Sequence, residues 1–177
     1  MSGHLAVDVT ADDHSQGPAD AVFVLVQYGD YECPYTRRSL REVDAVQGEL
    51  GPSLRWVFRN FPLTEIHPHA LQAAEAAEAA GTQGRFWGMH ALLFGHQKAL
   101  EEQDLRGHAA ELRLDLAAFE EDLARRAHLE RIRAEFDGGV RSGVGGTPTF
   151  FANGVRHDGP YAAAELLSAL RATKTAG

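Results

Sequence analysis

A long block of helical sequence lies between two β-rich segments, and this order limits the possible folds more than any other feature. From residue 67 to residue 141, apolar residues recur every three or four positions, as on helices that bury one face. Before the block, residues 21–28 form an apolar run typical of a buried strand, and residues 54–59 are aromatic and β-branched enough for a second strand. The pattern predicts an α/β domain that carries an inserted helical subdomain.

A helix is expected between the two early strands. Residues 34–49 follow the helical period, and the Gly-Pro pair at 51–52 predicts where the helix ends. A strand, a helix and a strand within about 40 residues imply a parallel pair with a right-handed crossover. Near the end of the chain, Asn153-Gly154 between two short strand-like runs predicts a type I′ hairpin, and residues 161–171 predict a closing helix.

Composition and charge exclude several classes of function. The 177 residues are enough for a core without disulfide staples, and Cys33 is the only cysteine, so any disulfide must join the chain to another molecule. A net charge of −8, without a basic patch that carries interleaved aromatic residues, argues against nucleic acid as a partner. No secretory signal and no apolar run of 18 residues is visible, which predicts a cytoplasmic protein with no membrane partner.

The single cysteine stands where a strand turns into a helix. Cys33 follows the first predicted strand, and Pro34 then occupies the first helical position, where its missing N–H costs nothing. The unpaired N–H groups of the first turn and the positive end of the helix dipole favour the thiolate over the thiol. Because the thiolate is the nucleophile, Cys33 is the candidate catalytic residue. Two neighbouring acids, Asp30 and Glu32, oppose the dipole, and the sequence leaves that balance open.

Six short motifs occur in order along residues 13–171. They are Asp13-His14 with Gly17-Pro18, Tyr28-Gly-Asp-Tyr-Glu-Cys-Pro-Tyr35, Phe58-Arg-Asn-Phe-Pro62, His67-Pro68, Phe86-Trp87 and Gly145-Gly-Thr-Pro-Thr-Phe-Phe151. Together they resemble the DsbA-like branch of the thioredoxin superfamily. The resemblance implies one structural domain of thioredoxin-like fold, formed by residues 21–66 and 142–177 with a helical insertion at 67–141. Residues 1–20 are then a polar lead-in that need not be well ordered.

The resemblance also assigns roles in substrate binding. In the family, the residue before a Thr-Pro bond lies beside the nucleophilic cysteine and the proline is cis. This implies a cis bond between Thr147 and Pro148, close to Cys33, at a cost of only about 0.5–1 kcal/mol. Pro34, Tyr35 and Thr147 are then the expected substrate-binding residues. The glycines between 138 and 146 lack the pattern of a phosphate loop and are interpreted as backbone slack before Pro148.

The chain departs from the family pattern at two positions. Thr36 stands where a second, resolving cysteine is usual, and Gln27, six residues before Cys33, stands where related proteins often carry a buried carboxylate. Because that acid assists proton transfer at the resolving thiol, the loss of both is coherent and suggests a monothiol site. Thr36 on the first helical turn can donate its O–H to the Cys33 sulfur or cap backbone groups, and both roles stay open.

The resemblance therefore implies a DsbA-like thiol–disulfide oxidoreductase of reductase, isomerase or deglutathionylation type, with Cys33, Thr36 and Pro148 as catalytic residues. Expected partners are protein or peptide thiols and disulfides, with glutathione or another external thiol as a possible co-substrate and no bound cofactor. Neither Cys-x-x-Cys nor His-Glu-x-x-His occurs, so no metal site is expected. A kappa-type glutathione transferase or isomerase and a non-catalytic binding or chaperone-like domain remain as alternatives, and the oligomeric state is not predicted.

Overall fold

The computed structural model describes residues 3–175, which divide into two compact units. The first unit holds the described parts of Met1–Gly29, Pro34–Phe61 and Phe136–Gly177. The second unit holds Asp30–Cys33 and Pro62–Glu135. The sequence places the helical insertion at 67–141. The second unit instead spans Pro62–Glu135 and also contains Asp30–Cys33, the four residues before residue 34. None of the helices within residues 3–175 is both long and apolar enough to cross a membrane.

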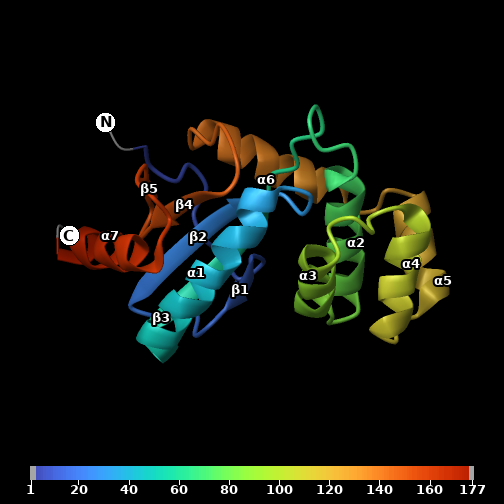
Figure 1. Ribbon diagram of the computed structural model, residues 1–177, viewed down its shortest axis with the longest axis horizontal. Coiled ribbons are helices and arrows are strands. Elements are labelled where there is room, and N and C mark those ends of the chain that lie inside the picture. The colour runs from blue at the N-terminus through green and yellow to red at the C-terminus, as the bar shows by residue number, and fades with distance from the viewer. Residues whose placement is uncertain (1–2, 176–177) are drawn as a thin grey trace. The chain divides into compact units, whose positions relative to one another are not determined.

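The first unit is built on a five-stranded sheet with the strand order β1-β3-β2-β4-β5 (Figure 1). The strands are β1 (His14–Gln16), β2 (Phe23–Gly29), β3 (Leu54–Asn60), β4 (Thr149–Ala152) and β5 (Val155–His157). Strands β2 and β3 are parallel, in register from Phe23 and Leu54 to Gly29 and Asn60. The other neighbouring strands are antiparallel. The predicted parallel pair is therefore confirmed.

Two long helices pack on this sheet. Helix α1 (Pro34–Leu50) connects β2 to β3 by way of a short 3₁₀ helix, η1 (Gly51–Ser53), and α7 (Ala163–Thr175) closes the chain. Both helices contact strands of the sheet and each other (Figure 1). Helix α1 buries Val43 and Val46, and α7 buries Leu166 and Leu170, so each helix turns one apolar stripe inward.

The predicted hairpin between β4 and β5 is confirmed. Its two turn residues, Asn153 and Gly154, have φ angles of +49° and +84°, as a type I′ turn requires. The Asn153 side chain also anchors the turn. Its Oδ1 accepts a hydrogen bond from the N–H of Val24 at 2.9 Å, and its Nδ2 donates to the carbonyl of Leu170 at 2.9 Å.

Part of the polar lead-in expected at residues 1–20 belongs to the sheet, and residues 1 and 2 lie outside the described residues. Residues His14, Ser15 and Gln16 form β1, which pairs with β3 at the edge of the sheet. The segment is polar because it lies at an edge and because it supplies partners to a buried cation. The polar composition alone did not reveal these contacts, because Arg55 and Arg59 lie about 45 residues further along the chain.

That buried cation is Arg59 on β3, which is 3% exposed. Its guanidinium bonds both carboxylate oxygens of Asp13, at 2.8 and 3.0 Å. It also donates to the carbonyls of Val7 and Asp8, both at 2.9 Å, and to the hydroxyl of Tyr28 at 3.1 Å. These bonds occupy all five N–H donors of an arginine. Arg59 therefore fastens the N-terminal segment to the sheet.

The second unit is helical. Its helices are α2 (Ala70–Thr82), α3 (Phe86–Gly95), α4 (Glu102–Glu111), α5 (Leu116–Ala124) and the first part of α6 (Leu129–Arg141). Seven alanines of α2 are each at most 1% exposed, so neighbouring helices approach its backbone closely on more than one side. Helix α4 is preceded by a capping box of Glu101 and Asp104, and α5 has Asp115 as its N-cap, whose side chain accepts from the Ala118 N–H.

Glycines 138–146 were interpreted as backbone slack, and for the first two this is wrong. Gly138 and Gly139 lie within α6, in the part that belongs to the first unit. A Cβ on Gly139 would stand 2.7 Å from a ring carbon of Phe61 and 3.0 Å from one of Tyr28. The absent side chain lets Phe136, one turn earlier, stack on Phe61 with ring centroids 4.2 Å apart. Packing, not flexibility, requires glycine here.

We predict that Gly139→Ala lowers the free energy of unfolding by about 1–3 kcal/mol, because the new methyl group must displace buried aromatic rings. The matched control is Gly48→Ala in α1, where a Cβ meets nothing within 4 Å. Alanine should there stabilise the helix by about 0.5–1 kcal/mol. Urea unfolding of both variants measures the difference, and equal effects would mean that α6 does not pack on Phe61 in this way.

Candidate active site

Cys33 is the last residue of the segment Asp30–Cys33 and stands directly before α1. Its sulfur is not part of a disulfide, and the residue is 3% exposed. The N–H of Cys33 donates to the carbonyl of Asp30 at 3.1 Å, which closes a tight turn. The lone thiol therefore lies at the start of a helix, with little of its surface open to a partner molecule.

One side chain of the second unit holds the backbone of this segment. Gln97, two residues after the end of α3, donates from its Nε2 to the carbonyls of Tyr31 at 2.8 Å and Cys33 at 3.0 Å. A primary amide has two N–H groups, so one Gln97 can serve both carbonyls. Gln97 therefore fixes the backbone at the nucleophile itself.

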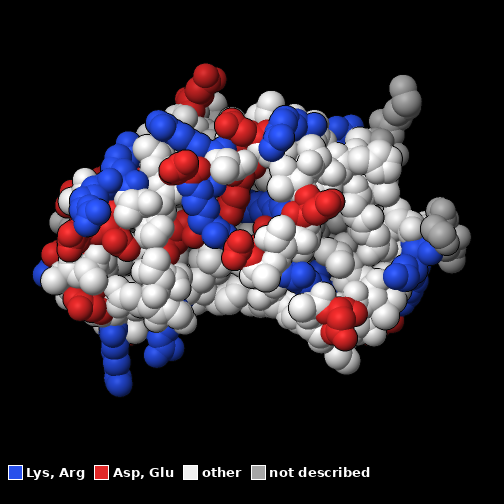
Figure 2. Space-filling model, turned by 180° about the vertical axis from the view of Figure 1, so that it is seen from behind, with Lys and Arg blue, Asp and Glu red and all other residues white. Residues whose placement is uncertain are grey.

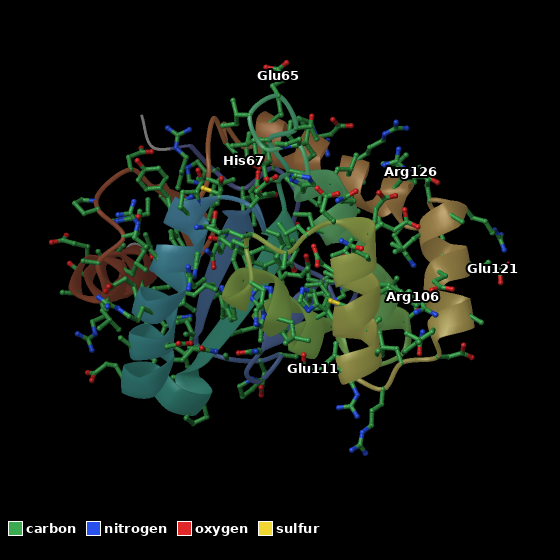
Figure 3. All side chains as sticks on the ribbon, turned by 45° about the vertical axis from the view of Figure 1, so that its right-hand side comes forward. Glu65, His67, Arg106, Glu111, Glu121 and Arg126 are labelled. Atoms are coloured by element: carbon green, nitrogen blue, oxygen red, sulfur yellow. The ribbon has the colours of Figure 1, made fainter. Side chains whose placement is uncertain are left out.

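The first of the two acids beside Cys33 is fully engaged. Asp30, 1% exposed, accepts hydrogen bonds from the backbone N–H groups of Glu32 and Leu63, both at 2.8 Å. Its Oδ2 also lies 2.9 Å from Nδ1 of His67 (labelled in Figure 3). Because a carboxylate only accepts, the His67 ring is the donor. These donors stabilise the negative charge of Asp30 and so weaken its electrostatic effect on the nearby thiol.

The second acid, Glu32, forms a chain of contacts with His69 and Glu101. Glu32 accepts from the backbone N–H of His69 at 2.7 Å and from its Nδ1 at 2.9 Å. The other ring nitrogen, Nε2, lies 3.1 Å from the carboxylate of Glu101, the N-cap residue of α4. The hydrogen bond to Glu32 is the main reason that the pKa of His69 is raised above 6.5. A ring that donates to two carboxylates carries both protons, so His69 bridges them as a cation.

We predict that protonation of His69 stabilises the fold at acid pH. A pKa raised by folding contributes stability that is fully present below the unfolded value of 6.5 and is lost as the pH rises through the folded value. The free energy of unfolding, measured by urea from pH 5.5 to 8.5, should therefore fall more in the wild type than in His69→Gln. The control is His96→Gln, since the His96 ring bonds the carbonyl of Leu92. Equal slopes in wild type and His69→Gln would contradict the bridge.

Tyr31, in the same segment, packs against helix α3. It is 1% exposed, its hydroxyl lies 3.1 Å from Nδ1 of His90, and its ring lies 4.8 Å from that of Phe94. Burial is the largest cause that raises the pKa of Tyr31 well above 10, and the negative charges of Glu78 and Glu135 add to it. Tyr31 is therefore neutral at physiological pH and acts as a packed support.

The first unit contains a neutral polar network beneath the first turn of α1. Thr36 is fully buried, and its carbonyl accepts from the Ser39 hydroxyl at 2.7 Å. The amide of Gln27 donates to that hydroxyl at 2.9 Å and accepts from the indole N–H of Trp56 at 3.2 Å. Gln27 is also fully buried. Its uncharged amide matches this site, because a buried carboxylate would need stronger compensation.

The Thr147–Pro148 bond is cis, as the resemblance predicts. Pro148 lines a hollow of about 350 Å³ in the first unit, together with Thr149, Arg156, His157, Asp158 and Tyr161. The hydroxyl of Thr149 donates to the carbonyl of Gly146 at 2.7 Å and holds the turn before β4.

The six predicted site residues are divided between the units. Cys33 lies in the second unit, and the other five lie in the first, namely Pro34, Tyr35, Thr36, Thr147 and Pro148. Among residues 3–175, no group of three or more His, Cys, Asp or Glu side chains is arranged to hold a metal ion.

The match to a known family covers most of the chain. Residues 9–172 fit the family model described as Thioredoxin. The chain belongs to this thioredoxin family. A thioredoxin-like oxidoreductase from Silicibacter pomeroyi DSS-3 is similar in structure, with a TM-score of 0.83, 26% identity and coverage of 95% of both chains. The thioredoxin-like α/β fold with a helical insertion is thereby confirmed.

Two DsbA-type structures share the fold at lower identity. BdbD from Bacillus subtilis has a TM-score of 0.83 and 19% identity, over 99% of this chain and 98% of that one. Wolbachia pipientis α-DsbA1 has a TM-score of 0.75 and 17% identity, over 95% and 94% of the two chains. The sequence resemblance to the DsbA-like branch is confirmed at the level of fold.

Curated relatives carry a different name. The chain is 48% identical to the Na(+)/H(+) antiporter NhaA 1 of Salinispora arenicola over 174 residues. The matched region covers 98% of this chain and 26% of that protein. NhaA 3 of Salinispora tropica is 48% identical over 158 residues, covering 89% of this chain and 24% of that protein. The chain thus spans about a quarter of the length of these relatives.

Sequence reasoning missed most of the residues that support Cys33. His67 entered only through the His67-Pro68 motif, and Gln97 and Ser39 were not noticed at all. Glu32 and His69 are 37 residues apart in the sequence, and Cys33 and Gln97 are 64 residues apart. The one available signal was the presence of two acids beside Cys33, since buried acids require donors from elsewhere in the chain.

Proposed function

We propose that the chain is a DsbA-like thiol–disulfide oxidoreductase that acts through a single nucleophile, Cys33. The observation that carries the proposal is the position of this sole cysteine directly before α1, with buried Thr36 in the place of a resolving thiol. The reacting sulfur stands directly before the first turn of α1, and the two acids near it in the chain, Asp30 and Glu32, are engaged by His67 and His69.

The proposed reaction is an exchange through a mixed disulfide. The Cys33 thiolate attacks one sulfur of a partner disulfide, a Cys33–partner S–S bond forms, and the partner's other sulfur leaves as a thiolate. Because the chain has no second cysteine, an external thiolate must then attack the mixed disulfide. It takes the place of Cys33 in the disulfide, and Cys33 leaves as a thiolate. Glutathione or a second thiol of the substrate can supply this step, which suits reduction, isomerisation or deglutathionylation.

Substrate contacts are proposed for the first unit. Tyr35 is 54% exposed, which supports a role as an apolar and aromatic contact next to Pro34. Thr147 precedes β4 and offers backbone groups to an extended peptide, as in strand addition.

Mass spectrometry after treatment with oxidised glutathione tests the proposal. The wild type should gain one glutathione, which a reductant removes, and Cys33→Ser should gain none. A protein that gains no glutathione while Cys33 stays reduced and accessible to alkylation would contradict the proposal. Saturable glutathione binding that survives Cys33→Ser would favour the kappa-type alternative, and neither adduct nor binding would favour a non-catalytic domain.

Ion transport is not part of this proposal. The antiporter name belongs to proteins of which this chain spans about a quarter, and no helix within residues 3–175 could cross a membrane. The cytoplasmic location stays a prediction from the sequence.

A further inference from the structure

The first two turns of α1 expose one aromatic and three basic side chains, Tyr35, Arg37, Arg38 and Arg41, here called the arginine face. All four are exposed, Tyr35 by 54% and the Arg41 side chain by 90%. Residues three or four apart are neighbours on a helix surface, so Arg38 and Arg41 adjoin each other, as do Arg37 and Arg41. The arginine face is therefore a continuous cationic surface.

The charges of the arginine face have almost no internal partners. Within residues 3–175, no carboxylate lies within ion-pair distance of Arg37 or Arg38. Arg41 reaches only its neighbour Glu42, at 4.0 Å. The guanidinium of Arg38 lies over the Tyr35 ring, 4.5 Å from the centroid, which orients it without neutralising it.

This arrangement is locally unfavourable for the helix. Like charges four residues apart, as on Arg37 and Arg41, repel each other on a helix surface, and a cation close to the first turn opposes the helix dipole. No acid stands in the first turn of α1 to offset them. The chain has only 17 Lys and Arg against 25 Asp and Glu, yet three arginines gather within five positions. On the face seen in Figure 2, opposite to that of Figure 1, basic and acidic side chains are interspersed.

The arginine face begins directly beside the nucleophile along the chain. Two helical turns extend only about 11 Å, and an arginine side chain is itself several ångströms long. Arg37 and Arg38 follow Cys33 by only four and five residues, so along the chain they stand within about two helical turns of the reacting sulfur. Because the arginines lack carboxylates of their own, a partner is the available source of them, and guanidinium groups bind carboxylates in a bidentate manner.

We infer that the arginine face selects disulfide partners that carry acidic residues next to the disulfide. This rests on the proposed function, because it assigns a substrate class to the same thiol. Opposite charges raise the rate of encounter by about 10- to 1000-fold at low ionic strength, and salt screens the effect. The selectivity should therefore appear in the rate of mixed-disulfide formation.

Three disulfide-linked peptides that differ only in the flanking residues, glutamate, serine or lysine, test the inference. Rapid acid quenching and mass spectrometry give the rate at which each forms a mixed disulfide with Cys33. We expect the glutamate peptide to react about tenfold faster than the serine peptide at low salt, and the lysine peptide to react slowest. In R37Q/R38Q the ratio of glutamate to serine rates should fall to near one. Glutamine keeps the helix propensity of these positions.

The matched control is R85Q/R133Q, which removes the same net charge from two exposed arginines elsewhere. It should keep the preference for the glutamate peptide. The inference is overturned if R37Q/R38Q slows all three peptides equally, because the arginines then act on Cys33 and not on the partner. It is also overturned if the control abolishes the preference, or if the wild type shows none. If no peptide reacts while Cys33 is still alkylated, the proposed function itself fails.

Discussion

Replacing Thr36 with cysteine is expected to change a persistent mixed disulfide into a transient one. The new thiol would stand three residues after Cys33, the spacing of a redox pair at a helix start. An internal thiol acts at high effective concentration, so the lifetime of the adduct with glutathione should fall by more than roughly an order of magnitude. Quenched-flow mass spectrometry measures that lifetime. Cysteine is close to threonine in size and is well tolerated at buried positions such as this one.

Two controls accompany this variant. Thr36→Ser keeps a hydroxyl without a thiol and should leave the adduct long-lived. Thr36→Cys combined with Cys33→Ser separates the reaction of the new thiol from that of Cys33. If Thr36→Cys forms no internal disulfide under mild oxidation, Cys33 is not positioned at the helix start as described, and the proposed chemistry fails with it.

In Thr36→Cys, Gln27 should limit the rate at which the new thiol resolves the mixed disulfide. Its amide accepts from Trp56 and donates to Ser39, so the network beneath α1 is neutral. A glutamate there could accept from the Trp56 indole N–H, and burial would raise the pKa of its carboxyl toward neutrality, where a general base works best. Resolution in Thr36→Cys should therefore accelerate further when Gln27→Glu is added, and insulin reduction by the single and double variants gives the order.

Removing the Arg59 guanidinium is expected to destabilise the fold more than any other single change considered. Arg59→Met would leave the carboxylate of Asp13 buried without its cation and the carbonyls of Val7 and Asp8 without their donor. Loss of one partner from a buried ion pair costs about 3–5 kcal/mol, a large part of the 5–15 kcal/mol that typically holds a domain together. Urea unfolding should show a correspondingly lower midpoint.

The control for Arg59 is the exposed pair of Arg156 and Asp158 in the same unit. Arg156→Met should cost much less than Arg59→Met, because surface ion pairs contribute little to stability. Adding Asp13→Leu to Arg59→Met should restore part of the loss, because no charge is then left buried. A cost for Arg59→Met similar to that for Arg156→Met would show that the N-terminal segment is not fastened through Arg59.

The features that the sequence predicted correctly have local causes. The apolar run at 21–28, the helical period after Pro34 and the Asn153-Gly154 turn each depend on residues that are close in the chain, and each occurs where expected. The cis bond at Pro148 came from family resemblance and not from a local signal. Edge strand β1 was missed because three polar residues carry no alternating pattern that would mark a strand.

The surroundings of Cys33 could not be predicted for a different reason. Its acids, His67, His69 and Gln97 come together only through long-range folding, and a single sequence has no periodic signal for such pairs. The same holds for Gly139, whose neighbours Phe61 and Tyr28 are about 80 and 110 residues earlier. Composition indicated that glycines were present, but only the packing showed which of them have no room for a side chain.

The alanines of α2 have a consequence for evolution. Since seven of them are almost wholly covered, almost any larger side chain along this helix would have to push a neighbouring helix away. Relatives that diverge freely on their surfaces should therefore keep small residues in α2, although none of these side chains can react with a disulfide. Small residues that are kept along α2 would then reflect close packing between helix backbones, and they should not be taken as a sign of catalysis.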